Sequence, residues 1–275
     1  MERRIKVAVI DGIADVRLDR PEKRNALDAD MCWELAELGK RLSQSEDVRV
    51  AVLSGEGKSF CAGLDVAALQ ELSTGGKFLP FTDLTKRSHG SANWVQHIVL
   101  LWRDLPFPVI AALHGEVYGG GFQLALGADI RVADPAARFG VMEGRWGLVP
   151  DMGGTVLMQQ LARTDVVREL TFTARTFSAD DAHRYGFVTR VVSNHLEQAM
   201  ETARTIAGLS PDAVRAAKRL LNGALARSLV ESLEEETREQ AGLLGSANQL
   251  EAIRAVKEVR PPRFASSSPP KSKKH

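Results

Sequence analysis

The sequence predicts a mixed α/β fold followed by a helical C-terminal part. Short apolar runs of strand length alternate with helical stretches up to residue 194, and only helical periodicity follows. This alternation is typical of parallel strands joined by crossover helices. A length of 275 residues lies at the upper end of what one hydrophobic core accommodates. We therefore expect one large α/β domain with a smaller appendage.

A hairpin and a long helix are expected first. Residues Ile5–Ile10 and Ala14–Leu18 flank Asp11-Gly12, a dipeptide typical of a two-residue hairpin turn. Asp28 is a favourable N-cap for the helix that begins after it. Apolar residues then recur at helical spacing, at Met31, Leu35, Leu38 and Leu42.

Apolar runs rich in β-branched residues predict the later strands of a parallel sheet. These runs are Val48–Leu53, Val109–Leu113, Ile130–Val132 and Phe187–Val192. Between the first two, Glu71–Gly90 has no clear periodicity. A long segment of this kind inside a domain is typical of a functional or mobile loop.

Four helices are expected after residue 194. They are His195–Leu209, Pro211–Leu225, Ser228–Leu244 and Ala247–Val259. The chain is thus divided into an α/β core over 1–194, a helical region over 195–264 and a tail over 265–275. The tail is rich in Ser, Pro and Lys, a composition that predicts disorder.

The overall charge excludes several classes of protein. Lys and Arg number 36 against 35 Asp and Glu, a net charge of +1, so neither nucleic acid nor a membrane surface is an expected partner. Two cysteines are too few for a disulfide framework or a thiolate metal site. No apolar run reaches the roughly 20 residues that span a bilayer. We expect a soluble, cytoplasmic protein.

Two glycine-rich turns lead from strands into helices. The first runs over Gly55–Asp65, and the second over His114–Gln123 with three consecutive glycines at 119–121. Such turns leave backbone N–H groups unpaired, and the N-terminus of a helix favours negative charge. Two donors from different turns are able to form an oxyanion hole.

A third glycine-rich stretch, Phe139–Gly154, contains two acids. Glu143 and Asp151 lie among apolar residues and glycines. A carboxyl group in a desolvated pocket has a raised pKa and exchanges protons near neutral pH. The spacing alone leaves open whether these acids are such groups or surface acids on loops.

Together and in this order, the stretches closely resemble the crotonase superfamily, the enoyl-CoA hydratase/isomerase family. Arg20–Leu27 resembles the CoA-contacting turn of that family, and Ser59–Asp65 its first oxyanion loop. Gly119–Gly121 resembles the second oxyanion loop, and Phe139–Pro150 the segment that carries the catalytic acid and base. The resemblance extends over Ile5–Phe264, nearly the whole chain.

The resemblance implies a crotonase-type spiral of repeated ββα units, with C-terminal helices that pack homotrimers, often paired into hexamers. It implies an acyl-CoA thioester substrate whose carbonyl lies between the N–H groups of Ala62 and Gly120, which stabilise an enolate. Contacts to CoA and the acyl group are implied at Lys23, Arg24, Ala26, Leu27, Lys58, Gly63, Leu64 and Asp65. No metal or separate cofactor is implied, because coenzyme A is part of the substrate.

One departure from the family pattern bears on the reaction. The two catalytic carboxylates of the family correspond to Gln123 and Glu143, and a glutamine orients water but cannot accept a proton. A single glutamate resembles the simple enoyl-CoA isomerases, so we expect Glu143 to act as acid and base. One alternative is a true enoyl-CoA hydratase using Glu143 with Gln123 or Asp151, whose position resembles an aspartate of the dienoyl-CoA isomerases. Another is a non-catalytic acyl-CoA binder.

Three further side chains are interpreted as structural. Cys61 is expected to be a small buried residue rather than a nucleophile, because no partner base can be assigned to it. Trp146 is expected in the core, and Asp65 is expected to cap the short helix that follows it.

Overall fold

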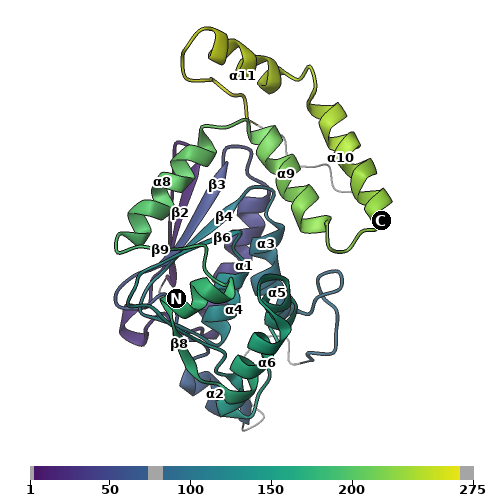
Figure 1. Cartoon of the computed structure of the whole chain (residues 1–275). Coiled ribbons are helices and arrows are strands. Elements are labelled where there is room, and N and C mark those ends of the chain that lie inside the picture. Colours follow the sequence, from purple (N-terminus) through teal and green to yellow (C-terminus); the bar gives the residue numbers. More distant parts are fainter. Residues whose placement is uncertain (1–2, 74–82, 267–275) are drawn as a thin grey trace.

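The computed structural model describes residues 3–73 and 83–266. A large twisted sheet forms the centre of the molecule, and helices cover it (Figure 1). The strand order of this sheet is β1-β2-β3-β4-β6-β9. The strands are β1 (Ile5–Ile10), β2 (Ile13–Leu18), β3 (Val50–Gly55), β4 (Val109–Leu113), β6 (Ile130–Ala133) and β9 (Arg190–Val191).

The predicted hairpin is confirmed, and so is the parallel arrangement of the later strands. β1 and β2 pair antiparallel with Ile10 opposite Ile13, while every other neighbouring pair of the large sheet is parallel. The parallel strands end on the same edge of the sheet. The turns that follow β3 and β4 therefore lie close together.

A second sheet was not predicted from the sequence. It consists of β5 (Glu116–Tyr118), β7 (Arg138–Gly140) and β8 (Thr176–Ser178), in the order β5-β7-β8. Strands of three residues are too short to show a period of two, so only tertiary pairing identifies them. This sheet supports the second glycine-rich turn, because β5 leads directly into helix α4 (Gly120–Leu126).

Each face of the large sheet buries a separate core. Alternate residues of β3 and β4 point to opposite faces, as the pleat of a strand requires. Leu53 and Ala111 pack among residues of α1 (Ala29–Ser43), α3 (Trp94–Asp104) and α4. Val52 and Ile110 pack on the other face against Ala199, Ala203 and Ala207 of α8 (His195–Ala207).

The helix starts follow the predicted local signals. The Asp28 side chain accepts a hydrogen bond from the Met31 N–H and caps α1, as expected. Asp65 accepts from the Ala67 N–H at 2.8 Å at the start of α2 (Val66–Ser73), so its predicted capping role is confirmed. The other core helices are α5 (Gly154–Leu161), α6 (Thr164–Thr173) and α7 (Ala179–Tyr185).

The C-terminal helices are α9 (Pro211–Gly223), α10 (Leu229–Leu243) and α11 (Ala247–Lys257). Helix α9 is tied to the large sheet by Lys218, whose Nζ donates to the Phe107 carbonyl at 2.9 Å and to Asp129 at 2.7 Å. Helices α10 and α11 extend away from the body of the molecule (Figure 1). Within the described residues, no helix is long and apolar enough to cross a bilayer.

Three expectations need correction. The strand expected over Phe187–Val192 shrinks to the two residues of β9, because the N–H groups of Phe187 and Val188 donate to the Ala182 carbonyl in α7 instead of to a neighbouring strand. Trp146 is 56% exposed rather than part of the core. Glu71–Gly90 is not one loop, because its first three residues belong to α2. Residues 74–82 of this segment, and 267–275 of the expected tail, lie outside the described residues.

Candidate active site

The two glycine-rich turns are joined by backbone hydrogen bonds. The Cys61 N–H donates to the Glu116 carbonyl, and the Tyr118 N–H donates back to the Cys61 carbonyl, both at 3.1 Å. A Cβ atom at Gly121 would lie 2.4 Å from the Cys61 carbonyl oxygen, so only glycine allows this approach. The turns after β3 and β5 thus form one continuous surface.

The first predicted oxyanion donor is already engaged. The Ala62 N–H donates to the Arg24 carbonyl at 3.0 Å, so it is not available to a ligand. Leu64 instead lies opposite Leu27 in an isolated parallel bridge. The hydrogen bonds of this bridge join Leu27 to the Gly63 carbonyl and to the Asp65 N–H, so the Leu64 N–H has no partner among the described residues. The position of Leu64 was predicted to contact substrate, but its N–H was not identified from the sequence.

The second predicted donor, the Gly120 N–H, also has no hydrogen-bond partner within the described part of the chain. A Cβ atom built on Gly63 would lie 3.7 Å from the Gly120 nitrogen, which places the two turns side by side. Gly63 and Gly119 have φ angles of +96° and +50°, a region that favours glycine. These conformations leave the N–H groups of Leu64 and Gly120 as the candidate oxyanion donors.

Gln123 and Glu143 form a buried pair beside these donors. Gln123 lies on α4, and Glu143 begins a 3-10 turn over Glu143–Trp146. The Gln123 Nε2 atom donates to Glu143 Oε1 at 2.6 Å, and the two residues are 2% and 9% exposed. A Cβ atom at Gly119 would lie 3.5 Å from Glu143 Oε1, so this carboxyl group lies next to the second glycine turn.

The protonation of Glu143 is set by opposing effects. Burial raises the pKa of its carboxyl group, and the nearby charge of Asp151 acts in the same direction. The hydrogen bond from Gln123 acts against this rise, because it stabilises the charged form. The second oxygen, Oε2, is buried and has no hydrogen-bond partner among the described residues. Such an atom is suited to accept a proton from a bound ligand.

Asp151 is near the pair but is not part of it. Its side chain is at the surface, and partial desolvation raises the pKa of its carboxyl group. No hydrogen bond within the described residues joins its carboxyl group to Glu143 or Gln123. The structure therefore brings together two of the three predicted catalytic residues and leaves Asp151 at the rim.

The turn predicted to contact CoA is fastened to the first glycine turn. Arg24 and Asn25 both have positive φ angles, 52° and 54°. Asn25 is fully buried, and its Nδ2 donates to the carbonyls of Glu56 at 2.9 Å and Ser59 at 2.8 Å. Its Oδ1 accepts from the Arg20 N–H at 2.8 Å. Asn25 was not singled out from the sequence, although an Asn in a turn is a known signal for a positive φ angle.

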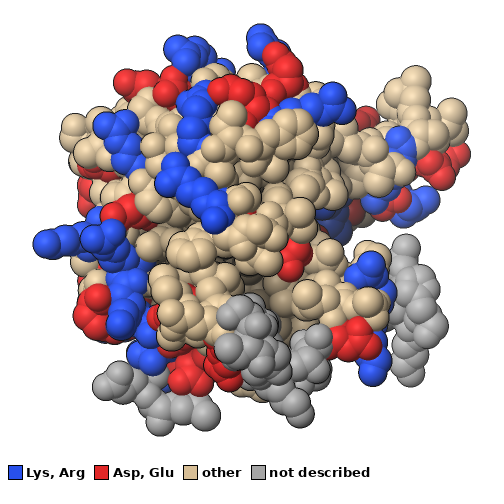
Figure 2. Space-filling view, turned by 90° about the horizontal axis from the view of Figure 1, so that it is seen from below, with Lys and Arg blue, Asp and Glu red and all other residues tan. Residues whose placement is uncertain are grey.

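The predicted CoA-contacting residues fall into two groups. Lys23, Arg24 and Lys58 are exposed, whereas Ala26 and Leu27 are buried and Leu27 packs against Gly120. Figure 2 shows Lys and Arg side chains, interspersed with Asp and Glu, mostly around the edges of a molecular face whose centre is mainly uncharged. Asp65 pairs with Arg20 at 2.5 Å; burial opposes its ionisation, but this hydrogen bond lowers the pKa of Asp65 below its usual range.

The Cys61 thiol is not suited to act as a nucleophile. Burial raises the pKa of the Cys61 thiol to about 12, so the group is protonated at neutral pH, and its predicted burial is confirmed. No group of three or more potential metal ligands is found among the described residues.

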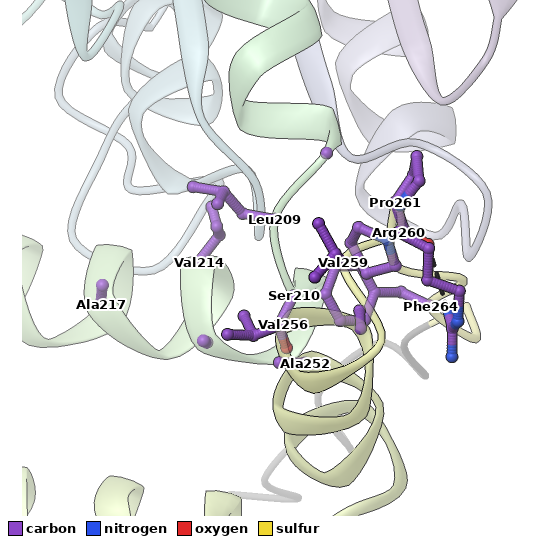
Figure 3. Close-up of a pocket in the computed structure, with 14 residues that line it drawn as sticks. Leu209, Ser210, Val214, Ala217, Ala252, Val256, Val259, Arg260, Pro261 and Phe264 are labelled. Carbon is purple, nitrogen blue, oxygen red and sulfur yellow. Dashed lines mark hydrogen bonds between the residues drawn. The ribbon is translucent and has the colours of Figure 1, made fainter.

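A separate apolar groove of about 800 Å³ lies away from these residues. It is formed by α9, by α11 and by the segment after α11, and Figure 3 shows Val214, Val256 and Phe264 among its walls. None of the predicted site residues lines it.

Comparisons with known proteins show which proteins this chain resembles. The model of the enoyl-CoA hydratase/isomerase family matches residues 9–267. Carnitinyl-CoA dehydratase of Proteus mirabilis is 34% identical over 223 residues, which are 80% of each chain. Carnitinyl-CoA dehydratase of Citrobacter koseri is 36% identical over 214 residues, or 76% of each chain. The crystal structure of enoyl-CoA hydratase from Bacillus anthracis superposes with a TM-score of 0.84 at 30% identity, covering 95% of this chain and 99% of that one.

Proposed function

Because the chain belongs to the enoyl-CoA hydratase/isomerase family, we propose that it forms the enolate of an acyl-CoA thioester and moves one proton through Glu143. The observation that carries the proposal is the buried, unpartnered Oε2 atom of Glu143, whose carboxyl group lies next to the second glycine turn. In this proposal the thioester carbonyl accepts hydrogen bonds from the Leu64 and Gly120 N–H groups. The two donors acidify the adjacent C–H group, because they stabilise the negative charge of the enolate.

We propose double-bond migration as the simplest reaction of this site. Glu143 Oε2 takes a proton from C2 of a 3-enoyl-CoA, and the electrons of that C–H bond pass into a dienolate. The same carboxyl group returns the proton to C4, which leaves the double bond between C2 and C3. One proton carrier is sufficient, and Gln123 cannot supply a second because an amide does not accept a proton at neutral pH.

Reversible hydration is the second candidate. The curated relatives above are named carnitinyl-CoA dehydratases, and elimination of water also begins with removal of a proton next to the thioester. This reaction needs a group that protonates the departing hydroxide. Asp151, whose raised pKa is compatible with that role, is the available acid if a bound substrate draws it inward.

One labelling experiment with two readouts distinguishes these reactions. The protein is incubated with 3-enoyl-, 2-enoyl- and 3-hydroxyacyl-CoA thioesters in isotope-labelled water, and mass spectrometry follows label in carbon-bound hydrogen and in oxygen separately. Isomerisation places no labelled oxygen in the product, whereas hydration does. A non-catalytic acyl-CoA binder incorporates neither label.

The role of Glu143 is tested by Glu143→Gln, which keeps the shape and removes the titration. General acid and base groups contribute about 10²–10⁴ in rate, so a loss of that size is expected. Glu37→Gln is the matched control, because Glu37 is exposed on α1 and belongs to neither glycine turn. Native rates of proton exchange in Glu143→Gln would exclude this residue as the proton carrier.

The proposal includes an assembly of identical subunits. Helix α10 has no buried residue, and α10 and α11 expose large apolar side chains, including Leu229, Val230, Leu233, Leu250, Ile253 and Val256. An exposed apolar surface of this extent is typical of a protein interface. We propose that these helices and the groove of Figure 3 pack against other copies of the chain, as a homotrimer or a dimer of trimers.

A further inference from the structure

The side chain of Gln123 is held at both of its polar atoms. Its Oε1 accepts two backbone N–H groups, from Met152 at 2.9 Å and from Gly154 at 3.0 Å. Its Nε2 donates to Glu143 Oε1 at 2.6 Å. Gln123 is 2% exposed, so solvent does not compete for these bonds. The amide thus connects the turn before α5 with the carboxyl group of Glu143.

The orientation of this amide follows from its partners. Exchanging its O and N atoms would direct the NH₂ group at two N–H donors and the carbonyl oxygen at a carboxylate. Neither contact is attractive, so only one orientation satisfies all three partners. Gly154 permits the close approach, because a Cβ atom at that position would lie 2.5 Å from Gln123 Oε1.

We propose that Gln123 is a positioning residue for the proton carrier: it occupies Glu143 Oε1 and thereby leaves Oε2 as the only oxygen that exchanges protons with substrate. This inference rests on the proposed function of Glu143. The amide also fixes the position of Glu143 relative to the turn at Met152–Gly154, because it is hydrogen-bonded to both. Gln123 itself neither touches the reacting atoms nor carries a proton.

The geometry predicts how Glu143 responds when the amide is replaced. Burial raises the pKa of Glu143, and the Gln123 hydrogen bond opposes that rise. Removal of a neutral donor from a charged acceptor in a buried site destabilises the charged form, so the pKa of Glu143 rises further. In Gln123→Met this increase is expected, because methionine has a similar length and no N–H donor.

Gln123→Glu separates the donor from the acceptor function. The new carboxylate still accepts the Met152 and Gly154 N–H groups, but it places a second acidic oxygen against Glu143 Oε1. Two buried carboxylates at this distance share one proton, so the pair titrates with one strongly raised apparent pKa. The upper apparent pKa is therefore expected to increase from the unaltered protein to Gln123→Met and further to Gln123→Glu.

The experiment is a pH titration of the purified full-length protein followed by infrared difference spectroscopy. The carbonyl band of the protonated Glu143 carboxyl group is identified by its loss in Glu143→Gln. Melting temperatures of all variants are measured in parallel, because the Met152 and Gly154 N–H groups lose their acceptor only in Gln123→Met. The side-chain amide resonance of Gln123 in the unaltered protein is followed by NMR over the same pH range.

The expected order of apparent pKa values supports the inference, and an unchanged or lowered pKa in both folded variants overturns it. If neither variant folds, the unaltered protein decides: the Gln123 amide resonance must move together with the Glu143 carboxyl band. Independent titration of the two signals overturns the inference. These measurements need no substrate, so they separate a wrong role for Gln123 from a wrong reaction, which the label incorporation described above detects.

Discussion

Replacement of Asn25 tests how the CoA-contacting turn is attached to the first glycine turn. Asn25→Ala removes three hydrogen bonds, two to the carbonyls of Glu56 and Ser59 and one from the Arg20 N–H. Asn25 is fully buried, so the three partners lose their bonds in a site with little access to water. The effect is expected on stability and on the position of both turns.

The magnitude follows from the number of bonds and from the backbone angle. A buried polar group without a partner costs about 1–3 kcal/mol, and the lower end applies here because Glu56 and Arg20 are only half-buried. Alanine at a φ angle of 54° adds about 1 kcal/mol, since its Cβ is unfavourable in the left-handed region. Asn25→Ala is therefore expected to lower the free energy of unfolding by about 4 kcal/mol.

Two control variants divide this loss into its parts. Asn25→Gly removes the same hydrogen bonds without the backbone strain, so it is expected to be about 1 kcal/mol more stable than Asn25→Ala. Asn25→Asp keeps the acceptor for the Arg20 N–H but faces two carbonyl oxygens with a carboxylate. Its deficit in stability is expected to shrink as the pH falls, because protonation returns one donor.

The assay is urea unfolding of each variant at one protein concentration, followed by circular dichroism. A loss below 1 kcal/mol in Asn25→Ala would refute the reasoning, because it would mean that water replaces all three bonds. Equal stability of the alanine and glycine variants would refute only the contribution assigned to the φ angle, and would leave the contribution of the hydrogen bonds intact.

Three further outcomes are expected. Leu64→Pro removes the proposed oxyanion N–H and lowers kcat by about 10²–10³ in a protein that still folds, whereas Leu64→Ala keeps the donor and most of the turnover. Equal kcat values of the two variants would contradict the assignment. Activity falls as the pH decreases through the pKa of Glu143, because the carboxylate is the proton acceptor. The midpoint of the pH profile of kcat/KM is expected above the ordinary pKa of a glutamate. A midpoint at or below that pKa would be inconsistent with the burial of Glu143. Val256→Glu, on the exposed face of α11, lowers the assembly mass in light scattering, and an unchanged mass would remove this face from the interface.

Local signals in the sequence predicted most of the large sheet and its helices. The Asp11-Gly12 turn, the Asp28 cap and the apolar runs of β3 and β4 depend on residues close together in the chain. The three-residue strands β5, β7 and β8 depend on partners distant in the chain, so no local signal identified them. Trp146 was predicted in the core from its apolar ring, but it ends a turn at the surface.

The candidate site shows the same division. The sequence by itself determined the family pattern, the glycines that allow the two turns to touch, and the single glutamate at position 143. Only the tertiary structure decided that Leu64 rather than Ala62 has an unpaired N–H, because Arg24 of a separate turn accepts from Ala62. It also decided that Gln123 holds Glu143. The physical reason is that a hydrogen bond depends on the position and direction of two groups, and for partners far apart in the chain the fold alone sets both.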